Sequence, residues 1–378
     1  MTDPNTLAVA RDLFAEIRAL APRIEQDRRL PPELMSKLTE AGFFRLAVPR
    51  ALGGLESDLR TILEVIEEAS RADGSTGWTV MIGAVTAVLS GWLDPAVAER
   101  IYTRDAFTGG VPAPLGQAHA TGGGYRLTGR WPFASGCHHA SWLVGGAILF
   151  KDGAPQPGVR MLLFPASEAK IHDTWHVSGL RGTGSHDMEV AGITVPRECS
   201  VSFATDRPRH PGPLYAFPVF SALALGVAAA ALGIARGAVD EVERIAREKT
   251  PLGSKVKLAA KPGTHARVAE AEATLRAARA FMHDAVGRCW ALVESGREVP
   301  LPVRAELRLA GTHATASAAR AVDLAYHLAG MTSISDSSHL QRAFRDVHVA
   351  TQHAMVGPDV AELAGAILLG MEADTARL

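Results

Sequence analysis

The chain has 378 residues, of which 47% are hydrophobic and 21% are charged, a balance that is typical of globular proteins and excludes wholesale disorder. Its 39 Lys and Arg residues nearly match its 40 Asp and Glu residues, so no overall field favours nucleic acid or an anionic membrane. At roughly 150 residues per domain, the length predicts two or three domains or one composite fold. We therefore expect a local site, rather than a charged surface, to hold a small-molecule substrate.

The first part of the chain is predicted to be helical. Leu13, Ile17, Leu20 and Ile24 recur at three- and four-residue steps, and that spacing is typical of the apolar face of a helix. Charged and apolar residues alternate in the first thirty positions, a pattern that does not predict a signal peptide. We expect an N-terminal helical domain over residues 1–105.

Glycine-rich segments with short β-branched runs come next. Residues 106–212 hold 17 of the 36 glycines, and runs such as 125–128 and 159–164 lie between them. Short strands separated by Gly, Pro and Asp predict an antiparallel sheet or small barrel. We expect this range to form a central β domain.

Long segments of Ala, Leu, Arg and Glu return after residue 212 and predict a helical bundle over residues 213–378. Its helices are expected near 219–247, 264–295, 302–330 and 338–355.

Two features bear on the compartment. Residues 211–235 carry no charged side chain but are rich in alanine, which contributes little transfer free energy, so they predict a buried helix rather than a membrane span. Cys137, Cys199 and Cys289 are widely spaced and form neither a CxxC pair nor a disulfide framework. The sequence favours a cytoplasmic protein that binds neither membrane nor nucleic acid.

Several common chemical motifs are missing. His348 and His353 are five residues apart, so they do not share a helix face as metal ligands at i and i+4 would, and no HExxH motif appears. There is also no GxxxxGK[ST] loop, no GxGxxG between a strand and a helix, and no GxSxG elbow. The sequence predicts no metal site and no hydrolase of the elbow type.

Two segments of the predicted β domain are rich in specific groups: residues 129–136 (Gly-Arg-Trp-Pro-Phe-Ala-Ser-Gly) and 175–187 (Trp-His-Val-Ser-Gly-Leu-Arg-Gly-Thr-Gly-Ser-His-Asp). From the residues alone, a sheet edge with a tight bend is the simpler interpretation. Together with residues 42–49, 73–78 (Asp-Gly-Ser-Thr-Gly-Trp) and 340–348 (Leu-Gln-Arg-Ala-Phe-Arg-Asp-Val-His), however, they resemble the acyl-CoA dehydrogenase superfamily, especially its two-component flavin-dependent monooxygenases. The likeness covers nearly the whole chain.

This resemblance implies a mainly α, α+β fold. Its parts would be an N-terminal helical domain, a central antiparallel β-barrel or sheet domain and a C-terminal four-helix bundle, with a flavin between the last two. It also implies a homotetramer, in which neighbouring bundles cover the apolar faces of the long helices.

Two departures distinguish the chain from the dehydrogenases of this superfamily. Many of those enzymes use a Glu just beyond the last Arg-Asp helix as the base, and Ala354 stands at that place here. They also bind FAD tightly with a Gly-Gly-x-Gly run, of which one glycine survives in residues 327–333. The resemblance therefore favours an oxygenase, which takes reduced FMN or FAD from a separate flavin reductase and reacts it with O₂ to a C4a-hydroperoxide.

The resemblance assigns the flavin to five neighbouring residues: Trp131, Phe133, Ala134, Ser135 and Gly136. Ser135 matches the Ser or Thr that faces flavin N5. The two aromatic side chains would form the walls around the isoalloxazine ring.

Four more side chains complete the expected site. His353 matches a histidine near flavin C4a, where an imidazole with a pKa of about 6.5 could deprotonate a phenol or share a proton with the peroxide; on an ideal helix, however, it faces solvent. Trp78 and His348 are expected at the substrate, although a histidine on an apolar face is more often packed in a core. Arg247 resembles an arginine that reaches a flavin phosphate from a neighbouring subunit, but an ordinary cation at a helix C-terminus fits equally well.

Three functions stay open at this level. They are oxygenation of a small aromatic or heterocyclic substrate, acyl-CoA dehydrogenation with a tightly bound FAD, and a non-catalytic protein of the same fold. Ala354 and the eroded glycine run count against the second, and Ser135 with His353 counts against the third. We further expect Arg345 and Asp346 to form a structural ion pair.

Overall fold

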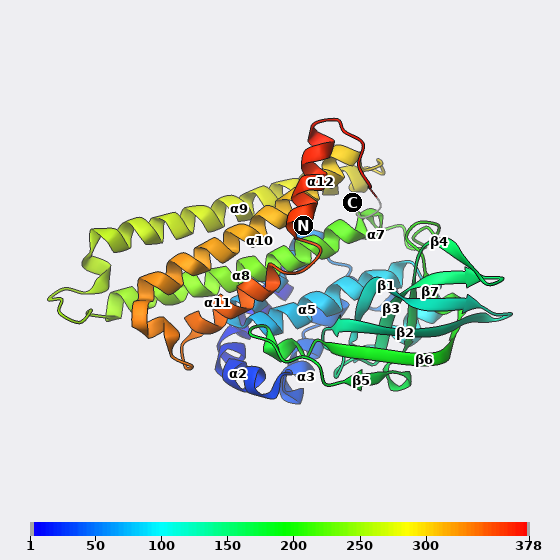
Figure 1. Cartoon of the computed structure of the whole chain (residues 1–378), viewed down its shortest axis with the longest axis horizontal. Coiled ribbons are helices and arrows are strands. Elements are labelled where there is room, and N and C mark those ends of the chain that lie inside the picture. The colour runs from blue at the N-terminus through cyan, green and yellow to red at the C-terminus, as the bar shows by residue number, and fades with distance from the viewer. Residues whose placement is uncertain (1–3, 376–378) are drawn as a thin grey trace.

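The computed structural model describes residues 4–375 and consists of N-terminal helices, one sheet and a C-terminal helical bundle (Figure 1). This is the mainly α fold that the sequence predicts. The N-terminal helices are α1 (Pro4–Asp12), α2 (Phe14–Asp27), α3 (Pro32–Glu40), α4 (Leu59–Ala72), α5 (Gly74–Thr86) and α6 (Pro95–Ile101). Asp58 and Asp73 begin α4 and α5 because their carboxylates accept the backbone N–H groups of Thr61 and Thr76.

The sheet has seven strands in the order β5-β6-β2-β1-β3-β4-β7. The strands are β1 (Thr108–Ala120), β2 (Gly124–Ala134), β3 (Trp142–Lys151), β4 (Ala154–Pro165), β5 (Lys170–His172), β6 (His186–Pro196) and β7 (Ser200–Val201). β1 and β3 run parallel and all other neighbours run antiparallel, so the sheet is mixed where an antiparallel one was expected. The parallel pair arises because residues 135–141 carry the chain from β2, on one side of β1, across to β3 on the other side.

The C-terminal part consists of α7 (Pro213–Ala216), α8 (Val219–Glu248), α9 (Pro262–Glu294), α10 (Leu301–Ala329), α11 (His339–Ala350) and α12 (Pro358–Leu368). The bounds of α8, α9 and α10 lie within two residues of those that the sequence predicts. The helix expected over 338–355 instead ends at Ala350, where Thr351 is the C-cap. A short irregular segment then leads to α12, which the sequence analysis did not predict.

Helix α8 forms the centre of the molecule, packed against both α10 and α4. Its alanines from 228 to 231 are fully buried, and Gly233 lies so close to α4 that a Cβ there would stand 2.2 Å from the backbone oxygen of Glu67. By length and composition α8 could cross a membrane, but 78% of its most apolar window is buried inside the protein. This packing is that of a core helix, as the sequence predicts.

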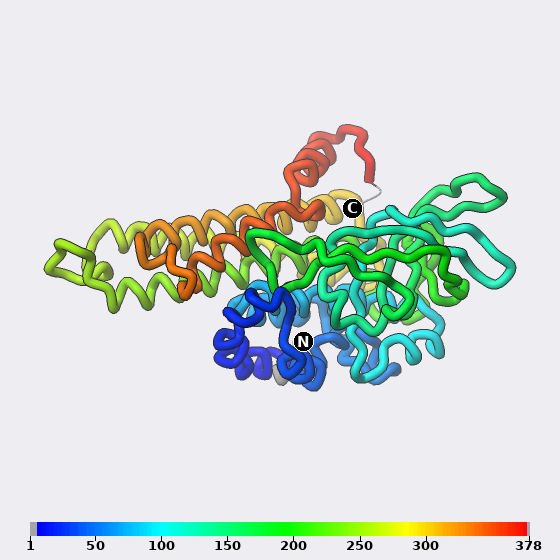
Figure 2. The backbone as a smooth tube through the Cα atoms, turned by 60° about the horizontal axis from the view of Figure 1, so that its bottom comes forward, coloured from blue at the N-terminus to red at the C-terminus, as the bar shows by residue number. Residues whose placement is uncertain are grey.

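The three parts of the fold meet around α5. This helix lies between α8 and the sheet (Figure 1). The loop that precedes β6 extends to α11 (Figure 2), where the Leu180 N–H donates to Asp346 Oδ1 at 2.6 Å. Side chains from all three parts therefore come together at the N-terminal half of α5.

Candidate active site

Trp78 projects from the second turn of α5 toward the end of β2. Its helix is held in place at both the cap and the face: Asp73 accepts hydrogen bonds from the N–H and the hydroxyl of Thr76, and a Cβ on Gly77 would stand 1.8 Å from Ser70 Oγ of α4. Trp78 Nε1 donates to Ser135 Oγ at 3.1 Å. The contact between α4 and α5 thus fixes the indole against the predicted flavin segment.

The end of β2 leaves regular strand geometry. The register with β6 shifts between Trp131 and Ala134, and both Phe133 and Gly136 have positive φ angles, of 66° and 71°. Positive φ is uncommon for a residue that carries a side chain. It turns Phe133 outward, where 66% of the residue is exposed and its ring stands 6.1 Å from that of Trp175.

Trp131 lies elsewhere than expected. A regular strand would place residues 131 and 133 on the same face, but the shift in register separates them. Trp131 is 0% exposed, and its Nε1 donates to the Gly146 carbonyl at 2.8 Å. Its ring therefore lies beneath the surface of this region, whereas the ring of Phe133 is exposed there.

A row of buried hydroxyl groups continues from Ser135. Its Oγ lies 2.7 Å from Ser185 Oγ, which lies 2.6 Å from Thr183 Oγ1, and the Thr183 hydroxyl donates to the Leu180 carbonyl at 2.8 Å. We call these three side chains, Ser135, Ser185 and Thr183, the hydroxyl row. The sequence marks the segment that contains Ser185 and Thr183 as rich in specific groups. Nothing local to that segment predicts a contact with residue 135, so neither residue could be given a role from the sequence.

His353 lies just beyond α11, in the irregular segment before α12. Its half-buried ring stands edge-on to Trp78, with 5.6 Å between the ring centroids. Burial, assisted by the positive charge of Arg308, lowers the pKa of His353 to about 4. Because Nδ1 accepts the Met355 N–H at 3.2 Å, the neutral ring carries its proton on Nε2. The structure thus brings Trp78, Ser135 and His353 together, with the imidazole neutral at pH 7.

His348 and Arg247 lie apart from this group. His348 Nε2 stands 2.9 Å from Asp323 Oδ1 of α10, and the His348 ring packs 4.6 Å from Phe344. Arg247, in the last turn of α8, is largely exposed and donates to Glu243 at 2.7 Å. Within one chain, His348 is thus a residue on the face of the bundle, and Arg247 is an ordinary cation at the C-terminus of a helix.

Asp346 is buried and does not pair with Arg345 as expected. Arg345 pairs with Glu25 of α2 instead, because Asp346 points the other way and accepts the Leu180 N–H. Burial, followed by the negative charge of Asp73, raises the pKa of Asp346 from 3.8 to about 7. Asp346 therefore anchors the loop that carries Thr183 and Ser185.

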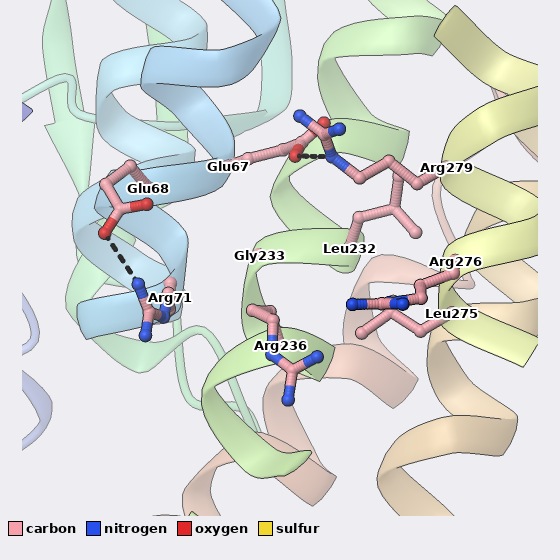
Figure 3. Close-up of a pocket in the computed structure, with 9 residues that line it drawn as sticks. All are labelled: Glu67, Glu68, Arg71, Leu232, Gly233, Arg236, Leu275, Arg276 and Arg279. Atoms are coloured by element: carbon pink, nitrogen blue, oxygen red, sulfur yellow. Dashed lines mark hydrogen bonds and ion pairs between the residues drawn. The ribbon is translucent and has the colours of Figure 1, made fainter. Parts of the chain in front are cut away.

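A cavity of about 280 Å³ lies between α4, α8 and α9 (Figure 3), and its lining contains none of the residues expected at the flavin or the substrate. Its arginines are already paired with acids, as in the contacts of Arg279 with Glu67 and of Arg71 with Glu68. Within residues 4–375, no group of three or more His, Cys, Asp or Glu side chains could hold a metal ion. The residues around Trp78 remain the candidate site.

Comparison with known proteins identifies the family. Residues 6–102 match the N-terminal domain, and residues 225–358 the C-terminal domain, of the acyl-CoA dehydrogenases. The chain belongs to the acyl-CoA dehydrogenase superfamily. This family assignment agrees with the motifs seen in the sequence.

Individual relatives of this superfamily member are oxygenases. An indole-3-acetate monooxygenase of Pseudomonas putida is 34% identical and covers 94% of this chain and 91% of the relative. The oxygenase component of an FADH2-dependent resorcinol hydroxylase of Rhizobium sp. is 32% identical, and the match covers 98% of this chain and 96% of the relative. The crystal structure of a 3-HSA hydroxylase from Rhodococcus sp. RHA1 superposes with a TM-score of 0.94 at 29% identity, over 100% of this chain and 99% of that one. The chain thus falls in the flavin-dependent monooxygenase branch of the superfamily.

Proposed function

We propose that this protein is the oxygenase component of a two-component system that uses reduced flavin and O₂ to oxygenate a small aromatic or heterocyclic molecule. The observation that carries the proposal is the contact of Trp78 with both Ser135 and His353. The names of the relatives, which include indole-3-acetate and resorcinol as substrates, support the substrate class. A separate reductase, which the name of the resorcinol enzyme's oxygenase component implies for that system, supplies the reduced flavin.

The residues at the end of β2 fit a flavin. The exposed ring of Phe133 offers a flat apolar face beside Trp175, and the Ser135 hydroxyl, which contacts Trp78 and Ser185, has a lone pair left for a ligand. Ala134, Ser135 and Gly136 would hold the ring edge, with Trp131 packed beneath them rather than against the ligand. Reduced flavin bound there supplies the electrons that activate O₂.

His353 manages the proton at this site as a donor. Since its Nδ1 is occupied by the Met355 N–H, it presents Nε2–H to a ligand oxygen. A pKa of about 4 keeps this form in place throughout the neutral range. His353 would therefore donate a hydrogen bond to a substrate oxygen, in place of acting as the base expected from an imidazole with an unperturbed pKa.

Trp78 would border the substrate and exclude water from it, and the substrate would extend along α11 toward His348. The dehydrogenase alternative lacks support because Ala354, at the place of the base, cannot exchange a proton.

Arg247 would reach the flavin phosphate of a neighbouring copy, because its side chain is exposed in the single chain. Buried free cysteines support a reducing, cytoplasmic environment.

The homotetramer belongs to the proposal as well. Several large apolar side chains of the bundle and its loops are exposed in the single chain: Leu252, Met331, Ile334, Leu368 and Leu369. Packing between copies would cover them. Sedimentation equilibrium at micromolar concentration should give four times the mass of one chain, and a monomer mass would contradict this part.

The decisive experiment is to mix the purified protein, which we expect to be colourless, with reduced FMN or FAD without oxygen, then with oxygenated buffer, and to follow the absorbance. We expect a flavin species that is oxidised slowly compared with free reduced flavin. A yellow preparation with stoichiometric FAD that an acyl-CoA thioester bleaches would overturn the proposal in favour of a dehydrogenase.

A further inference from the structure

The hydroxyl row has a direction that its last member determines. Thr183 Oγ1 lies 2.8 Å from the Leu180 carbonyl oxygen, which can only accept, so the single hydroxyl proton of Thr183 is used there. Thr183 must therefore accept from Ser185 at 2.6 Å, and Ser185, its own proton now used, must accept from Ser135 at 2.7 Å. All protons in the row consequently point toward Leu180.

The direction of the hydroxyl row also determines the hydrogen-bonding state of Ser135. Its proton is donated to Ser185, and one of its two lone pairs accepts the Trp78 N–H. The second lone pair of Ser135 Oγ is left without a partner among these contacts. Ser135 is thus able to accept one more hydrogen bond from a ligand and unable to donate one without reversing the row.

The surrounding structure holds the row in this direction. The Leu180 carbonyl also accepts Trp175 Nε1 at 3.1 Å, while Leu180 itself has a φ of 49° and is anchored through its N–H to Asp346. Ser135, Thr183 and Ser185 are all buried, so water is not at hand to supply alternative partners. Reversal would break the hydrogen bond from the Thr183 hydroxyl to the Leu180 carbonyl, which would keep Trp175 Nε1 as a donor, so its cost is that of one lost hydrogen bond.

We propose that Ser185 and Thr183 are positioning residues that make the site selective for reduced over oxidised flavin, by fixing Ser135 as a hydrogen-bond acceptor. Reduced flavin carries a proton on N5 and can donate to Ser135, whereas N5 of oxidised flavin is itself an acceptor and would face a lone pair. This inference rests on the proposed function, since it assigns flavin N5 to Ser135. It gives a physical basis for a cofactor that arrives reduced and leaves oxidised.

The test compares dissociation constants for reduced and oxidised flavin, titrated anaerobically and aerobically, together with the midpoint potential of the bound flavin. In Ser185→Ala, the Ser135 proton loses its acceptor and can turn toward N5. The ratio of the oxidised to the reduced dissociation constant should then fall about tenfold, which for a two-electron couple lowers the midpoint potential by about 30 mV. Thr183→Val should act in the same sense, because it frees the Ser185 proton to turn toward Ser135.

Three further variants distinguish an effect of the proton direction in the hydroxyl row from an effect of side-chain packing. Ser185→Thr keeps a hydroxyl and should keep the wild-type ratio. Trp78→Phe removes a donor to Ser135 but leaves the row directed toward Leu180, so overall affinity can change while the ratio stays. Ser90 lies in the 3₁₀ helix Ala87–Gly91 that follows α5, and its buried hydroxyl donates to the Ala87 carbonyl. Ser90→Ala therefore controls for the loss of a buried hydrogen bond outside the row.

An unchanged ratio in both Ser185→Ala and Thr183→Val, in protein that still binds flavin, would overturn the inference and leave the proposed function standing. Equal weakening of both flavin forms would do the same, because it indicates a packing role. If the wild type binds neither form of FMN or FAD, the proposed function fails, and the inference fails with it.

Discussion

Asp346→Asn should change how the stability of the protein depends on pH. Burial raises the pKa of Asp346 from 3.8 to about 7, so between these values the folded protein keeps a proton that the unfolded chain has lost. The unfolding free energy therefore falls as pH rises from about 4 to about 7. At about 1.4 kcal/mol per pKa unit, the fall contributed by this one carboxyl is about 4 kcal/mol.

The asparagine side chain has no proton to lose, yet its Oδ1 can still accept the Leu180 N–H. Any cost of burying the amide is the same at every pH. The test therefore depends on how the unfolding free energy changes with pH, and not on its value at one pH. Chemical denaturation of wild type and Asp346→Asn at pH 5, 6, 7 and 8 should give a difference in unfolding free energy that moves in favour of the variant up to about pH 7 and then levels off. Asp152→Asn, at an exposed hairpin turn, controls for loss of one surface charge, and parallel pH curves for wild type and Asp346→Asn would refute the reasoning.

Three other substitutions have clear expected results. His353→Ala should bind flavin normally but lower product formation by roughly 10²-fold, and the missing turnover should appear as hydrogen peroxide. His353→Gln keeps a hydrogen-bond donor and should recover part of the product formation. If the alanine variant couples flavin oxidation to product as well as the wild type does, the donor role is wrong. Ser135→Ala should weaken binding of reduced flavin about fivefold through loss of one hydrogen bond, and an unchanged anaerobic titration would exclude that bond. Gly77→Ala should destabilise the fold by about 1–3 kcal/mol in thermal unfolding because its Cβ would overlap Ser70, whereas Gly122→Ala, with open space around it, should change little.

Much of this fold follows from local pattern. Long segments of Ala, Leu, Arg and Glu, with few glycines to interrupt them, favour helix along their whole length, so the bounds of α8, α9 and α10 were predicted within two residues. The end of α11 was not, because no Gly or Pro stands between residues 351 and 356 to mark it. That end decides where His353 lies: a continuous helix would have turned it toward solvent.

The remaining features depend on contacts between distant segments. Ser135 and Ser185 are fifty residues apart, and their hydrogen bond exists only because β2 and the loop before β6 lie side by side. Likewise, alternation along β2 gives Trp131 and Phe133 the same face, and only the shift in register against β6 separates them. No pattern within either segment contains that information.

The burial of α8 also has a consequence during synthesis. One side of this apolar helix is covered by α4, which has already been made, but the other is covered by α10, which ends at Ala329. At ~5–20 residues per second, the roughly eighty residues from Glu248 to Ala329 take on the order of 4–16 s to translate. During that time the nascent chain carries a helix that is long and apolar enough to cross a membrane, and one face of this helix is uncovered. We therefore expect nascent chains truncated before α10 to bind chaperones that recognise apolar segments, and full-length chains to be released from them.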